Sequence, residues 1–169
     1  MKKTVLIPTD FSVDSLNTLK LFLNNYTNNN SSYNIILLHG YALPTGIPNL
    51  LFFSKEKTLE ALTREEFKEV CMMIKNKFAS KINVIRTDLF TGFNNAAFAN
   101  YLEGNEVNEI CFNSSMRLQQ TSKNSFDLTK FINKSKIKLI DIVRNVETEI
   151  KTADEKNIST PLTNTVAIN

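Results

Sequence analysis

Several residue types are scarce in this 169-residue chain, and each scarcity excludes a class of protein. The chain holds only 4 Gly and 4 Pro, too few for a fibrous or low-complexity protein. It has no uncharged apolar run long enough to cross a membrane. Apolar residues nevertheless make up 42% of the chain, too many for an intrinsically disordered protein. These numbers favour one compact domain with a short appendage.

The chain also lacks a large excess of charge of one sign, with 20 Lys and Arg against 17 Asp and Glu. A net charge of +3 does not demand a polyanionic partner. Four lysines between residues 130 and 138 form a basic edge, but the aromatic residues beside them occupy positions expected to point inward. A surface for stacking bases is therefore not predicted. We expect neither a nucleic acid nor a membrane as partner.

The cysteines and the first residues point to a cytoplasmic location. Cys71 and Cys111 lie inside apolar patterns, so we expect them to be reduced core residues. The apolar stretch after Lys2 and Lys3 ends at Pro8, which is too short for a secretory signal.

Short apolar runs alternate with helical patterns along the chain. Buried runs predict strands at residues 4–7, 33–39, 82–87, 109–113 and 137–143. Helical spacing predicts helices at 12–25, 55–78 with a break near Thr63, 94–103 and 126–133. This alternation is typical of a doubly wound α/β domain, with a five-stranded parallel sheet, strand order 3-2-1-4-5, and helices on both faces. Residues 1–143 would form it, with 42–53 as a long loop carrying apolar anchors and 144–169 as a polar, flexible tail.

In an open parallel sheet, ligands bind beyond the carboxyl ends of the strands, where the strand order reverses. For this order Asp10 would stand on one side of the crevice, and Asn113 and Ser114 on the other, with His39 and Gly40 nearby. The sequence has no paired carboxylates in one motif, no nucleophile elbow, no phosphate-binding Walker loop and no cluster with zinc-ligand spacing. We therefore expect no catalytic residues and no metal site.

The opening, Pro8-Thr9-Asp10-Phe11-Ser12 before an apolar helix, resembles that of the universal stress protein (UspA-like) family. Leu37-Leu38-His39 at the end of the second strand and Asn124-Ser125-Phe126 before the last helix fit the same family, so the resemblance covers about residues 3–143. It implies an adenine-nucleotide site, with Asp10 on the adenine side. It also implies a homodimer formed across the last strand, whose apolar edge residues are Ile137, Leu139, Ile140 and Ile142.

Nucleotide-binding members of the family carry the pattern G-x2-G-x9-G-[ST] after the fourth strand, where glycines let backbone N–H groups approach phosphates. This chain has no glycine from residue 113 to 125. Ser114, Arg117 and Asn124 stand near the places of the three glycines, and Ser125 keeps the helix start. The nucleotide residues that the resemblance implies are Pro8, Asp10, Gly40, Asn113, Ser114, Arg117, Asn124 and Ser125.

The leading hypothesis is a non-enzymatic stress-response or regulatory domain. It would act as a dimeric scaffold with an unidentified protein partner, with ATP binding lost or weak and no cofactor required. Two alternatives stay open: a sensor that holds ATP with Mg²⁺ or a related adenine nucleotide on a remodelled loop, and a weak nucleotide hydrolase. A non-nucleotide ligand on the apolar stretch from Ile47 to Phe53 also stays open.

Overall fold

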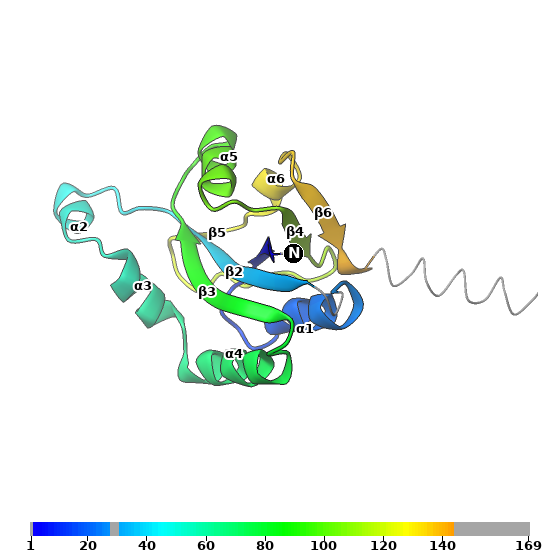
Figure 1. The fold of residues 1–169 in the computed structure, drawn as a ribbon. Helices are drawn as coiled ribbons and strands as arrows, with labels where there is room; N and C mark the ends of the chain where they lie inside the picture. Colours follow the sequence, from blue (N-terminus) through cyan, green and yellow to red (C-terminus); the bar gives the residue numbers. More distant parts are fainter. Residues whose placement is uncertain (1, 28–30, 144–169) are drawn as a thin grey trace, which may run out of the picture.

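A parallel sheet forms the centre of the molecule. The structure, a computed structural model, describes residues 2–27 and 31–143 (Figure 1). The main strands lie in the order β3-β2-β1-β4-β6, and all neighbours are parallel. Their bounds are β1 Lys2–Pro8, β2 Ser32–Tyr41, β3 Ile82–Phe90, β4 Glu109–Phe112 and β6 Lys138–Asp141. The predicted order is confirmed, with β6 in the place of the fifth strand.

Helices cover both faces of this sheet, which explains why its central strands are apolar at consecutive positions. Val5 and Ile7 of β1 pack into one hydrophobic cluster, whereas Leu6 between them packs into the other. Burial on both faces removes the polar–apolar alternation of a half-exposed strand. The first cluster is closed by α1 (Leu16–Asn25) and α4 (Glu65–Lys77), the second by α5 (Asn95–Gly104) and α6 (Thr129–Ile132), on opposite sides of the sheet in Figure 1.

The predicted break near Thr63 is confirmed. It separates α3 (Lys55–Leu62) from α4, because Thr63 is extended, with φ −87° and ψ 105°. A buried carboxylate fixes α3 to the sheet. Asp88 on β3 pairs with Lys55 at the start of α3, and it accepts a hydrogen bond of 2.7 Å from the Tyr101 hydroxyl on α5.

The helix predicted at 126–133 is wrong at its beginning. Ser125–Phe126 forms a short sixth strand, β5, that pairs antiparallel with Gly40 and Tyr41 of β2, and only Thr129–Ile132 is helical. The five-stranded parallel sheet therefore gains an antiparallel strand, and Ser125 does not cap a helix. The cause lies in a contact distant in sequence, since the Ser125 hydroxyl is bound to His39 at the end of β2.

The expected loop at 42–53 also differs from its prediction. It contains a short helix, α2 (Ile47–Leu51), and most of its large apolar side chains face solvent instead of anchoring it. Among the residues that the structure describes, no helix has the length and apolarity to cross a membrane. The predicted tail, residues 144–169, lies outside the described residues.

Candidate functional site

Asp10 lies at the carboxyl end of β1 and is 3% exposed. One carboxylate oxygen, Oδ1, accepts hydrogen bonds from the backbone N–H and the hydroxyl of Ser12, at 2.9 and 2.6 Å. The other, Oδ2, accepts one from the backbone N–H of Gln119 at 2.8 Å. Between Asp10 and Ser12, Phe11 takes the left-handed conformation, with φ 60°, which is strained for a bulky side chain and fixes the tight turn.

These donors determine the charge of Asp10. Burial alone raises the pKa of a carboxyl, but the hydrogen bonds from Ser12 and Gln119 outweigh it and hold the pKa of Asp10 below its usual value. Asp10 is thus ionised at neutral pH, and both of its oxygens already have donors within the chain.

His39 connects the ends of three segments. Its Nδ1 lies 2.8 Å from the carbonyl oxygen of Thr9, which can only accept, so Nδ1 carries the proton. Nε2 then accepts a hydrogen bond of 2.8 Å from the Ser125 hydroxyl, which in turn accepts one of 3.1 Å from the backbone N–H of Ser122. Burial lowers the pKa of His39, more than the Thr9 carbonyl and Asp10 raise it, so the imidazole is neutral. The arrangement ties β1, β2 and β5 together.

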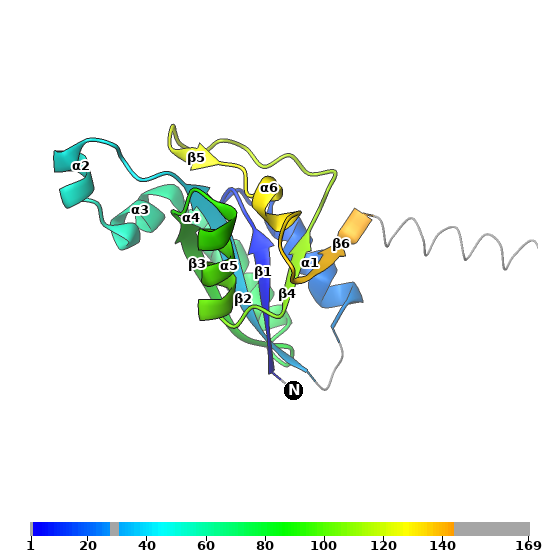
Figure 2. The ribbon, with the colours of Figure 1, turned by 90° about the horizontal axis from the view of Figure 1, so that it is seen from above.

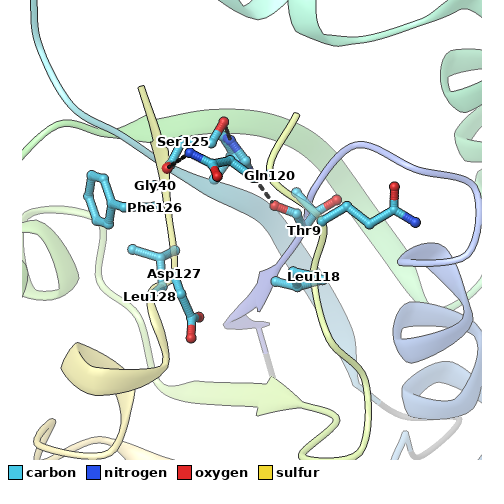
Figure 3. Close-up of a pocket in the computed structure, with 10 residues that line it drawn as sticks. Thr9, Gly40, Leu118, Gln120, Ser125, Phe126, Asp127 and Leu128 are labelled. Atoms are coloured by element: carbon cyan, nitrogen blue, oxygen red, sulfur yellow. Dashed lines mark hydrogen bonds between the residues drawn. The ribbon is translucent and has the colours of Figure 1, made fainter. Parts of the chain in front are cut away.

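The segment from 113 to 125 crosses the carboxyl ends of the strands, as Figure 2 shows. Gln119 lines two separate cavities of about 230 Å³ each, one beside Asp10 and one beside His39 and Ser125. In the second of these, Leu118 faces Asp127 and Leu128 across the cavity (Figure 3). Both cavities are smaller than ordinary small-molecule sites, whose volumes are roughly 300–1,000 Å³.

A larger cavity of about 440 Å³ lies beside the end of β4. Pro8, Asn113, Ser114 and Arg117, four of the eight residues expected to hold a nucleotide, line it together.

The structure places the other four elsewhere. Asp10 lines the cavity on the far side of Gln119, and Gly40 and Ser125 line the one beside His39. The Asn124 side chain donates to the Tyr41 hydroxyl at 3.4 Å. Sequence reasoning missed Gln119 and also Thr121, whose hydroxyl donates to the backbone carbonyl of Asp10 at 3.1 Å. Gln119 acts through its backbone N–H, so its side chain gave no signal in the sequence.

Backbone N–H groups along the glycine-free segment are used within the chain. The Asn113 side chain accepts from the N–H groups of Ser115 and Met116, and Asp141 accepts from that of Ser114. Further along, the N–H groups of Gln119, Ser122 and Asn124 donate to Asp10, Ser125 and Ser122. Within the described residues, no three His, Cys, Asp or Glu side chains gather where they could hold a metal ion.

Comparison with solved structures identifies the architecture. The universal stress protein UspA from Lactobacillus plantarum matches with a TM-score of 0.52 and 11% identity, over 82% of this chain and 96% of that one. The hypothetical protein PH0823 matches with a TM-score of 0.51 and 20% identity, over 82% and 94%. This chain has a UspA-like fold. A scan of family models and a search of curated proteins found no match.

The UspA-like fold places the first and fourth strands side by side, so the crevice predicted from the strand order lies where Asp10 and Asn113 stand. In this chain the segment from 113 to 125 crosses the crevice. Gln119 lies between the cavity beside Asp10 and the one beside His39, whereas the cavity at the end of β4 is lined by Pro8 and Asn113 without Gln119.

Proposed function

We infer that this chain is a non-enzymatic, UspA-like stress-response or regulatory domain whose adenine-nucleotide site is closed by its own chain. The observation that carries this proposal is the hydrogen bond from the Gln119 N–H to the Asp10 carboxylate. The resemblance assigns Asp10 to the adenine side, where a nucleotide needs that carboxylate as an acceptor. A nucleotide would have to displace Gln119, and the lost bond lowers its affinity.

The phosphate side supports the same proposal. A phosphate-binding loop works because backbone N–H groups point at the ligand. Here the N–H groups of Ser114, Ser115 and Met116 already donate to side chains of the chain. ATP with Mg²⁺ is then bound weakly or not at all, and the domain requires no cofactor.

The scaffold role rests on the edge of the sheet. Among the described strands β6 pairs only with β4, so its other edge is available to a second copy. Of the four apolar residues expected at a dimer interface, Ile140 and Ile142 are buried within this chain and Ile137 is half-buried, whereas Leu139 is 38% exposed. Leu139 is therefore the side chain that would contact the partner copy of a homodimer.

Calorimetric titration with Mg-ATP, ADP and AMP tests the closed site. We expect no binding tighter than about 100 μM, equivalent to roughly −5.5 kcal/mol. Ion-pair chromatography of the denatured protein checks for nucleotide carried through purification, and none is expected. Tight binding, or a stoichiometric amount of carried nucleotide, overturns the proposal.

One observation favours the sensor as a second candidate. The cavity lined by Pro8, Asn113, Ser114 and Arg117 has about 440 Å³, within the range of small-molecule sites, and Arg117 supplies a cation for a phosphate. A sensor predicts saturable binding that Arg117→Ala weakens at least about tenfold. A hydrolase further requires nucleotide turnover above that of Asp10→Ala.

A further inference from the structure

Helix α2 presents its apolar face to solvent. Ile47, Leu50 and Leu51 share one face of this helix by their spacing, and Phe52 follows directly. Ile47 is 80% exposed, Leu51 77% and Phe52 82%. Both ribbon views place α2 outside the sheet and its covering helices (Figures 1 and 2). These four side chains are called the α2 tip below.

The base of the tip is held firmly, so its exposure is a built feature. Phe53 stacks on Tyr41 of β2, with ring centroids 6.2 Å apart. The Ser54 hydroxyl accepts from the backbone N–H of Lys57 and caps α3. Lys55 in turn pairs with the buried Asp88.

The segment around the tip also carries no charge. No Asp, Glu, Lys or Arg occurs from residue 21 to residue 54; this run includes the buried strand β2, but its part from residue 42 to residue 52 is largely exposed. Apolar patches that bind proteins are normally surrounded by a polar rim. A segment without charged side chains is better suited to the apolar part of a lipid bilayer, where every charge is costly.

The backbone of the tip fits such a medium as well. The N–H groups of Leu50, Phe52 and Phe53 donate to carbonyls of the same segment, at 2.9–3.2 Å. Pro44 and Pro48 have no N–H to satisfy. Few backbone N–H groups of the tip would therefore lose a hydrogen bond to water on entering lipid. An unsatisfied backbone group is the main free-energy cost of that transfer.

We propose that the α2 tip inserts into the interfacial layer of a lipid bilayer and holds the domain at a membrane surface. Of the charged residues that follow the tip, Lys55 is paired with Asp88 and Glu56 lies beside Lys57, so the contact rests on the apolar side chains and not on headgroup charge. Phe93, 87% exposed, lines a hollow of about 310 Å³ with Leu43 and Lys130, so apolar surface with a neighbouring cation continues past the base of the tip. This proposal departs from the sequence expectation that a membrane is not a partner.

The chain contains no tryptophan, which allows a direct test. The variant Phe52→Trp places a single indole at the tip, and Met72→Trp places one on α4 as a matched control, because Met72 is exposed but lies far along the chain from the tip. With vesicles of phosphatidylcholine and phosphatidylglycerol, we expect the Phe52→Trp emission to shift to the blue and to be quenched by brominated lipid. Met72→Trp should do neither.

Two further variants distinguish insertion from an electrostatic contact and from self-association. In the Phe52→Trp background, Ile47→Asp with Leu51→Asp should reduce vesicle partitioning at least about tenfold, whereas Met72→Asp with Met73→Asp should leave it unchanged. Retention of most binding at high salt supports insertion, and its complete loss overturns it in favour of a purely electrostatic contact. No shift with any vesicle overturns the proposal. A second copy of the chain would give a different result: the Phe52→Trp emission would be blue-shifted without lipid, and light scattering would give the mass of a dimer. The Asp variants would then return the mass to that of a monomer, and this outcome overturns the proposal and assigns the tip to self-association.

Discussion

The backbone N–H of Gln119 donates to the carboxylate of Asp10 over 2.8 Å, joining residues that are 109 positions apart in sequence. The bond holds the segment from 113 to 125 over the end of β1, between the cavity beside Asp10 and the cavity beside His39. Together with the hydrogen bonds from Ser12, it explains how a carboxylate that is only 3% exposed stays charged. The first prediction follows from the donor being a backbone group.

Gln119→Pro removes this N–H, whereas Gln119→Ala keeps it. We expect the proline variant to lose about 1–3 kcal/mol of unfolding free energy, because a buried carboxylate oxygen loses its donor. The alanine variant should stay within about 0.5 kcal/mol of the parent, as exposed substitutions usually do. Urea denaturation of the three proteins measures this, and equal losses for both variants would show that the side chain matters and the N–H does not.

Acid should weaken the fold partly through Asp10. Its pKa in the folded state lies below the unfolded value, so its contribution to stability is complete above the unfolded pKa and is lost as the pH falls through the folded pKa. Asp10→Asn removes this contribution. The difference in unfolding free energy between parent and variant should therefore shrink as the pH is lowered from neutral into the acid range. A difference that stays constant with pH would mean that the charge of Asp10 contributes nothing to folding.

Gly40 allows β5 to approach β2. A Cβ at this position would lie 2.5 Å from the carbonyl oxygen of Phe126, a distance that the backbone must change to relieve. Gly40→Ala should cost about 1–3 kcal/mol of unfolding free energy. Gly104→Ala is the control, because a Cβ there meets nothing within 4 Å and the site is helical, so that variant should be neutral or slightly stabilising. Thermal denaturation of both decides the matter, and an undisturbed Gly40→Ala would refute the close approach.

Leu139→Lys should convert the proposed homodimer to monomers, because it places a charge at the exposed edge of β6. Val84→Lys is the matched control, since Val84 is similarly exposed on β3 at the other edge of the sheet. Light scattering gives the mass of each. If Leu139→Lys remains dimeric while its fold is intact by circular dichroism, the interface lies elsewhere.

The sheet could be predicted from the sequence because its information is local. Runs such as Val5-Leu6-Ile7 are apolar at every position, and only burial on both faces accounts for that. The alternation of such runs with helical spacing then limits the topology to few choices. The break at Thr63 is equally local, because Glu65 and Glu66 directly after it form the acidic first turn of α4.

The closed site could not be predicted in the same way. Ser125 and Phe126 fit a helical pattern, and only the contacts with His39 and Gly40, 85 or more positions away, make them a strand. Gln119 acts through its backbone, which every residue possesses. The missing glycines from 113 to 125 do indicate a changed phosphate loop, but an absence does not say which groups take over the space.

The amide of Gln119 gives the most direct test of the closed site, and heteronuclear NMR of the labelled protein can observe it. The account predicts that this N–H exchanges slowly with solvent, and that its resonance does not move when Mg-ATP is added to millimolar concentration. Rapid exchange, or a saturable shift of the Gln119 resonance on ATP addition with loss of its protection, would contradict it and show that Asp10 is available to a nucleotide.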